Sequence, residues 1–410
     1  MKTFSLPQAL GSIAVALATF SSAKAEYIGY ENPLATLDQR SLDALAIEIY
    51  QNNSFIVLKA EANVAYQTAH GLPISDEASS TLDAAIEELV FSATQNAVNN
   101  DPYYLKVYWV DVPGGKYFYD NPDCIYRIIP ISSDVDYMVT GYRHKPGPTD
   151  VSFSLISDPN SQNFVAYLAG SNLAVIGDGS YTITNNSSPA DGQTNQIQFT
   201  TPAKHDITGH SAISTAGIIA DAKWNLQEAI VDYGVGTLGL KTTVSAVNTL
   251  STPSQSSTLG TPASQDSSFG HFNLTDDEAL VVTLTPGAAD YFVFPGTNPW
   301  MVTVDPGSSQ ISLNNKQSVA NEIEDYTFVV SVTDPGVYNE VKTTGLREGT
   351  IMVRWQGLNP SSSSTESVAL EVQKVELSDL ASVIPSKTRY VTTQERALQL
   401  ADCVAGYSQD

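Results

Sequence analysis

The segment DNPDCIYR, residues 120–127, places two carboxylates, a thiol, a phenol and a guanidinium within eight positions. If CIYRIIPI is a strand, Arg127 shares one face with three isoleucines. An unpaired buried guanidinium is strongly unfavourable, so Arg127 is predicted to pair with a carboxylate or carbonyl groups, or to bind an anionic ligand. Asp120 and Asp123 are the nearest acids. The alternative, which we favour, is that DNPD forms an Asx-type turn and that Arg127 is a structural clamp.

A second dense segment, DPGVYNEVKTTGLREGTIMVRWQ, covers residues 334–356 and reads as a turn, a loop and a strand. Together with the NPW motif at residues 298–300, it supplies aromatic and planar polar side chains. A sugar site combines an aromatic platform with such polar groups. We therefore expect one pocket to collect the ligand-binding candidates, which are Asp120, Asp123, Tyr126, Arg127, Asn298, Trp300, Asn339 and Arg347.

Other kinds of site find little support. The GHSAI motif at residues 209–213 lacks the last glycine of a nucleophile elbow, and His205 and His210 share neither a helix face nor a strand face. No glycine-rich phosphate loop is present. The sequence thus indicates no catalytic residue, metal or cofactor. Cys124 and Cys403 fit either one disulfide or two buried free thiols, and both interpretations stay open.

The first 25 residues have the order of a secretory signal peptide. Lys2 precedes an apolar stretch, and Ala23-Lys24-Ala25 matches the small-x-small cleavage pattern. Cleavage after Ala25 would remove two lysines and no acid, which moves the formal net charge from -24 to -26. We expect a secreted or periplasmic protein with no transmembrane segment in the mature chain. So acidic a chain repels phosphate backbones, which argues against a nucleic-acid partner.

The elements that must position these residues differ along the chain. Residues 26–100 are expected to be a helical N-terminal segment, with helices over 36–51 and 81–98 from their apolar spacing. Residues 101–245 alternate like strands, with one helix over 216–234 that Gly234 should end.

The C-terminal part begins with a Ser/Thr/Pro-rich stretch, residues 246–270, predicted to be a linker or long loop. Strand patterns return over residues 271–376 and predict a β-sandwich of jelly-roll type. Residues 377–410 form a helical tail in which Thr392 and Glu395 have capping-box spacing. This helix should dock through Ala397, Ala401 and Val404. The fold class is therefore mainly β, with a helical N-terminal segment, antiparallel β-sandwich or jelly-roll domains and peripheral helices.

These motifs together resemble the family called domain of unknown function 1214. The residues that match its C-terminal signature are Asp334, Pro335, Gly336, Asn339, Thr344, Gly345, Gly349 and Arg354. NPWM, SLNNKQ and the DNPDCIYRIIPI segment also resemble the family, over most of residues 100–375. The chain departs from the pattern at Glu340-Val341, where the family has tryptophan and leucine. The resemblance implies a β-rich, jelly-roll-like C-terminal domain and no particular activity.

Two functions follow as hypotheses. The first is an exported enzyme or binding protein for a neutral organic ligand such as a carbohydrate, held in a β-sandwich cleft. The second is a non-catalytic structural or envelope-associated protein whose motifs are all turns and clamps. The sequence does not determine the oligomeric state.

Overall fold

A computed structural model of the chain provides the structure. It describes residues 36–51, 55–56, 59–60, 62–64, 75–112, 114–144, 151–158, 160, 162–186, 196–198, 212–256, 261–262, 264–304, 308–321, 324–358 and 367–407. The expected signal peptide, residues 1–25, lies outside these residues. None of the helices in the described ranges is both long enough and apolar enough to cross a membrane.

The N-terminal region, which we define as residues 36–243, contains the larger helices. Helix α2 (Leu37–Tyr50) begins at Thr36, whose hydroxyl accepts a hydrogen bond from the Gln39 amide at 3.1 Å. Helix α4 (Asp76–Val98) begins at Ser75 in the same way and is longer than predicted. Both helices bury the apolar faces that their spacing indicated.

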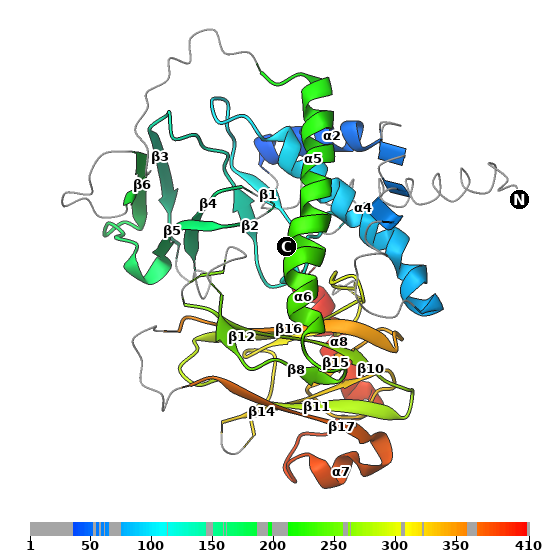
Figure 1. Cartoon of the computed structure of the whole chain (residues 1–410). Helices are drawn as coiled ribbons and strands as arrows, with labels where there is room; N and C mark the ends of the chain where they lie inside the picture. The colour runs from blue at the N-terminus through cyan, green and yellow to red at the C-terminus, as the bar shows by residue number, and fades with distance from the viewer. Residues whose placement is uncertain are drawn as a thin grey trace, which may run out of the picture.

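Helix α5 (Thr215–Glu228) does not end at Gly234, so that prediction is wrong. The chain continues as a π-helix, η2 (Ala229–Gly239), and then as α6 (Leu240–Thr243). Gly234 serves packing instead, because a Cβ there would lie 2.3 Å from the Phe118 ring. Figure 1 shows this continuous helix beside α4, running down onto the sandwich.

Short strands fill the rest of the N-terminal region. Strand β1 (Tyr108–Val110) pairs with β2 (Tyr126–Ile128). Beside them lie β3 (Tyr137–Tyr142), β6 (Ser180–Asn186) and β7 (Gln196–Gln198) in one sheet, and β4 (Ser152–Ile156) with β5 (Phe164–Ala169) in another. The β6–β7 pair is parallel, and the other pairs are antiparallel.

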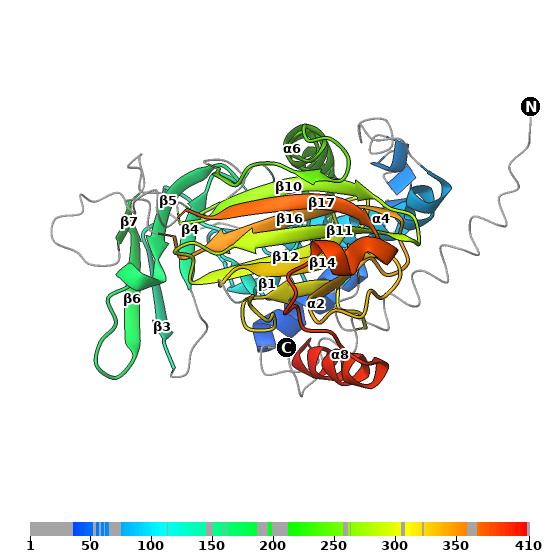
Figure 2. The same cartoon turned by 90° about the horizontal axis from the view of Figure 1, so that it is seen from below.

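Two packed sheets form the C-terminal β-sandwich (Figure 2). The six-stranded sheet contains β8 (Thr249–Leu250), β9 (Ser254–Gln255), β10 (Asp266–Asn273), β12 (Tyr291–Thr297), β13 (Ser312–Asn314) and β16 (Glu348–Gln356). The four-stranded sheet contains β11 (Glu278–Thr285), β14 (Tyr326–Ser331), β15 (Glu340–Lys342) and β17 (Ala369–Glu376). The molecule is thus mainly β with helices, as the sequence predicted.

The stretch expected to be a linker, residues 246–270, instead contributes β8, β9 and the first half of β10 to the six-stranded sheet. Ser267 and Ser268 are almost fully buried there. Small hydroxyl side chains suit a sheet position that another layer covers closely, which a low apolar content does not reveal.

Alternation along β16 connects two hydrophobic cores. Ile351 and Trp355 point into the sandwich core with Phe328, whereas Met352 points to the opposite face and joins a second core. That second core also contains Phe269 and Trp300, together with apolar residues of α4, α5 and η2. The helices therefore cover the outer face of the six-stranded sheet and share a core with it.

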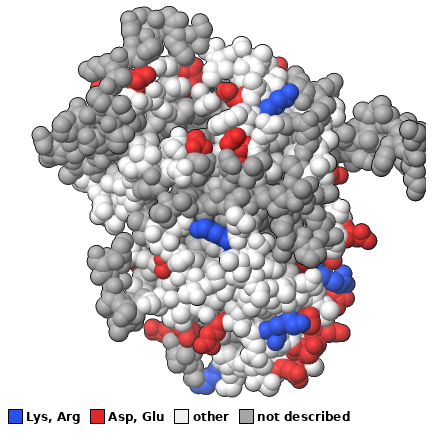
Figure 3. Space-filling view, viewed as in Figure 1, with Lys and Arg blue, Asp and Glu red and all other residues white. Residues whose placement is uncertain are grey.

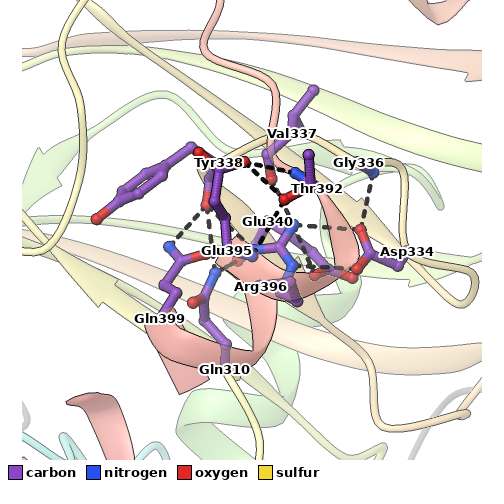
Figure 4. A network of polar contacts seen from close by, with 10 residues as sticks. All are labelled: Gln310, Asp334, Gly336, Val337, Tyr338, Glu340, Thr392, Glu395, Arg396 and Gln399. Carbon is purple, nitrogen blue, oxygen red and sulfur yellow. Dashed lines mark hydrogen bonds and ion pairs between the residues drawn. The ribbon is translucent and has the colours of Figure 1, made fainter. Parts of the chain in front are cut away.

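The tail contains η4 (Leu377–Asp379), α7 (Leu380–Val383) and α8 (Thr393–Tyr407). The capping box is confirmed, since the Glu395 amide donates to the Thr392 hydroxyl at 3.2 Å and the Thr392 amide donates to Glu395 at 2.8 Å. The predicted docking face is wrong, because Ala397 and Ala401 are exposed. Figure 4 shows that Arg396 docks the helix through polar contacts instead.

Candidate functional site

Three of the predicted site residues fix the NPW turn beneath α4. Trp300 is fully buried, and its indole N–H donates to the carbonyl of Ala78 at 2.9 Å. The Asn298 side-chain oxygen accepts from the Trp300 amide at 2.9 Å. Asp120 accepts from the Thr303 amide at 2.8 Å and from its hydroxyl. No face of the Trp300 ring is available as a sugar platform, because the residue has no exposed surface.

Asp123 and Asn339 tie other parts of the backbone together. Asp123 accepts from the Tyr291 hydroxyl at 2.9 Å and from the Asn314 amide group at 2.7 Å. Asn339 exchanges two hydrogen bonds with the backbone of Val319, each of 2.8 Å. These contacts join loops to strands of the sandwich.

Arg347 and Arg127 lie on the surface. Arg347 forms an exposed ion pair with Asp276 at 2.8 Å. Arg127 is exposed, so its expected burial is wrong: β2 pairs only with β1, and Ile125 is exposed beside it. In a two-stranded sheet, no second layer has to pack on the face that carries the three isoleucines, so Arg127 on that face can stay in contact with solvent. The predicted residues hold separate parts of the fold and do not line one pocket.

The Asx-type turn that we favoured for DNPD is confirmed. The Asn121 side-chain oxygen accepts from the Asp123 amide at 3.1 Å, and the Cys124 amide donates to the Asn121 carbonyl at 3.0 Å. Cys124 and Cys403 are both free thiols, which leaves the disulfide interpretation without support in this structure.

A different group of residues lies where the N-terminal region meets the six-stranded sheet. Its centre is Arg354 on the outer face of β16, with Ser267 and Val293 as cross-strand neighbours. Arg354 is only 7 % exposed. Its Nη2 donates to the carbonyl of Tyr119, and its buried Nη1 has no hydrogen-bond partner in the described part of the chain.

Asp111, in the segment after β1, lies within electrostatic range of this guanidinium. Its carboxylate accepts from the Tyr117 amide at 2.6 Å. Burial, and next the charge of Asp120, raise the pKa of Asp111 well above its usual range, whereas Arg354 and Lys116 lower it less. No ion pair joins Asp111 to Arg354, although the structure describes both. Asp111 and Arg354 are thus close enough to influence each other electrostatically, although no ion pair joins them.

Aromatic and thiol side chains lie within electrostatic range of Asp111 and Arg354. The charges of Asp111 and Arg354 both act on the pKa values of Cys124, Tyr126 and Tyr233, although burial is the largest cause of the upward shift in each. The ring of Tyr233, on η2, lies 5.1 Å from that of Tyr117, whose buried hydroxyl has no partner. We call this group the Arg354 cluster: Asp111, Tyr117, Cys124, Tyr126, Tyr233 and Arg354.

One member of the cluster belongs to the set predicted from sequence. Tyr126 is 39 % exposed, while burial still dominates the pKa of its phenol. Tyr126 is thus the member of the cluster that a ligand could reach from the surface.

Unusual backbone geometry accompanies the cluster. Asp111, Tyr119 and Met301 have positive φ angles of 61°, 51° and 62°, which non-glycine residues rarely adopt. The Tyr119 amide donates to the Met301 carbonyl at 2.6 Å, so two of these residues support each other. Strained residues and π-helices such as η2 both occur frequently at functional sites.

Sequence reasoning missed most of this cluster. Arg354 lies in the segment that resembles the family signature, but no function was predicted for it. A charged residue in the apolar run IMVRW could have indicated a buried polar site. Asp111 is an isolated acid before a PGG turn, and nothing local marks it. Among the described residues, no group of three or more His, Cys, Asp or Glu side chains is placed to hold a metal ion.

Comparisons with known proteins give information on the fold and none on the chemistry of the site. A scan against protein-family models finds no match, and neither does a search of curated proteins. A crystal structure of an uncharacterized protein from Burkholderia cenocepacia is similar, with a TM-score of 0.64 at 20% sequence identity over 79% of this chain and 96% of that chain. The VPA0106 protein from Vibrio parahaemolyticus matches with a TM-score of 0.21 and 12% identity, over 38% of this chain and 37% of that chain. The chain therefore shares its fold with the Burkholderia protein.

Proposed function

We propose that this chain is an exported protein that binds a small organic ligand, such as a carbohydrate, at the Arg354 cluster. The observation that carries the proposal is the buried Nη1 of Arg354, which has no hydrogen-bond partner among the residues that the structure describes. A buried charge with an unsatisfied donor is unfavourable, and it occurs where a ligand or ordered water completes the site.

The surroundings of Arg354 suit an oxygen-rich organic molecule. Tyr117, Tyr126 and Tyr233 supply apolar ring surface together with hydroxyl groups, and Arg354 supplies planar donors. The sequence predicts the same residue types in a sugar site, but it places that site at the NPW motif and not at Arg354. Export rests on the signal-peptide pattern of residues 1–25 alone.

The surface charge supports a small ligand over a polyanion. On the face shown in Figure 3, basic side chains stand singly among acidic ones, and the acids gather toward the end of the sandwich that carries β17 and α7. Such a face repels nucleic acid.

A second candidate is a non-catalytic structural or envelope-associated protein. One observation favours it: most of the predicted site residues, including Asp120, Asn298 and Asn339, are engaged in holding turns and loops. In that case the Arg354 cluster would hold water only.

A thermal-shift screen separates the two candidates. The panel contains neutral sugars and small organic acids, tested on wild type, on Tyr126→Phe and on Tyr142→Phe, an exposed tyrosine on β3 that serves as the matched control. We expect a ligand to raise the melting temperature of wild type and of the control, and to raise that of Tyr126→Phe less. If no compound moves wild type, or if Tyr126→Phe responds like wild type, the proposed site is wrong.

A further inference from the structure

Two buried cations, one of them in the Arg354 cluster, lie at this contact between the N-terminal region and the sandwich. Arg354 and Lys116 are buried cations, and the Lys116 ammonium donates to the Thr303 carbonyl at 2.8 Å. Asp120 is the buried anion nearby, and it already accepts two hydrogen bonds from Thr303. Neither cation forms an ion pair with a described carboxylate, and Nη1 of Arg354 has no hydrogen-bond partner among the described residues.

We propose that the ligand presents a carboxylate to Arg354, so that the protein binds an organic acid, such as a sugar acid, in preference to a neutral sugar. This inference rests on the proposed function and narrows its ligand class. It also revises the neutral ligand expected from the sequence.

The geometry of the donors supports a carboxylate. Nη2 of Arg354 is occupied by the Tyr119 carbonyl, whereas Nη1 is unoccupied and enclosed. A carboxylate oxygen on Nη1 would form a charge-assisted hydrogen bond, and its negative charge would neutralise the buried guanidinium. A sugar hydroxyl could accept the same hydrogen bond but would leave the charge uncompensated.

Asp111 sets the pH at which such a ligand is accepted. When ionised, its carboxylate opposes a second carboxylate nearby; when protonated, it adds a hydrogen-bond donor. Burial raises the pKa of Asp111, so the protonated form persists to higher pH than in an ordinary aspartic acid. The titratable and charged groups that act on Asp111, or on which it acts, are Asp120, Arg354, Lys116, Tyr117, Cys124, Tyr126 and Tyr233.

The proposal predicts a specific response to Asp111→Asn. This variant keeps a side-chain oxygen for the Tyr117 amide and removes the charge. Affinity for a carboxylate should fall with rising pH in wild type, since ionisation of Asp111 then introduces repulsion. In Asp111→Asn the affinity should stay nearly constant, and at the higher pH it should exceed that of wild type by about tenfold.

The test is a calorimetric titration with matched probes. Glucose and glucuronate differ only in a CH₂OH group against a carboxylate, and benzoate is an acid that is not a sugar. Each is titrated up to about 10 mM into wild type, Asp111→Asn and Tyr142→Phe at several pH values across the range in which all three proteins stay folded. We expect an acid to bind at least about tenfold more tightly than glucose, with the pH dependence lost only in Asp111→Asn.

The outcomes separate the inference from the function on which it rests. Equal binding of glucose and glucuronate would keep the ligand site but overturn the preference for a carboxylate. No heat from any of the three probes, in folded wild type, would overturn both. If an acid binds and its affinity depends on pH to the same extent in Asp111→Asn as in wild type, its carboxylate lies away from this cluster. That result would overturn the inference.

Discussion

Glu340 should destabilise the protein at neutral pH, although it forms an ion pair. Its side chain, on β15, is 2 % exposed. One carboxylate oxygen lies 3.1 Å from Nη2 of Arg396, and the other is buried with no partner (Figure 4). Burial, the largest cause, raises the pKa of Glu340 from 4.5 to about 7, and Arg396 only partly opposes this shift.

The pKa shift sets the magnitude of the effect. A shift from 4.5 to about 7 corresponds to about 3 kcal/mol of destabilisation when the group is ionised in both states. Because the folded-state pKa is raised, the folded protein binds the additional proton. The destabilisation is therefore absent below pH 4.5, grows as pH rises, and is complete above pH 7.

Glu340→Gln removes the ionisable group and keeps the shape. We expect the variant to be more stable than wild type by up to about 3 kcal/mol at pH 8, and the difference to vanish at pH 4.5. Urea unfolding of both proteins at the two pH values measures it. Glu371→Gln, at an exposed position of β17, is the matched control and should show no pH-dependent difference. A variant that is less stable than wild type at pH 8 would show that the Arg396 pair outweighs the burial of the carboxylate.

Four further predictions follow from individual contacts. Arg127→Met should change the free energy of unfolding by less than about 0.5 kcal/mol, because the side chain is exposed; a loss of several kcal/mol in urea unfolding would contradict the structure. Trp300→Ala should lose about 3 to 5 kcal/mol by the same assay, because the indole is fully buried between α4 and the sandwich. Thiol titration of the unfolded chain without reductant should find both cysteines reactive, and a single protected pair would restore the disulfide. Intact mass of the exported protein should show cleavage after Ala25, and a retained leader would refute the signal peptide.

Local signals in the sequence predicted local structure well. Thr36 and Thr392 begin helices because a hydroxyl at that position accepts a hydrogen bond from a backbone amide of the first turn. The Asx turn at DNPD depends on Asn121 and its two following residues. Strand alternation after residue 271 gave the sandwich. In each case the residues that determine the structure lie within a few positions of one another.

Features that depend on distant contacts were not predictable in this way. Gly234 is a suitable helix end, yet Phe118 packs against it and the helix continues. Arg127 looks buried along its strand, but burial depends on whether another layer covers β2. Arg354 and Asp111 lie near each other only because the fold brings β16 and the segment after β1 together, and their separation in sequence conceals this proximity.

The shared core explains why the Arg354 cluster can stay polar and unpaired. Trp300, Phe269 and Met352 pack with the helices on the same sheet face that carries Arg354, so neighbouring positions of that face are fixed by apolar burial. Asp111 is held in turn by the Tyr117 amide at a strained backbone angle. Each of the two residues thus belongs to an element that other contacts hold in place, and no ion pair joins them. The free protein therefore retains a buried guanidinium whose Nη1 has no partner among the described residues, and a ligand that satisfies it should raise the stability of the fold.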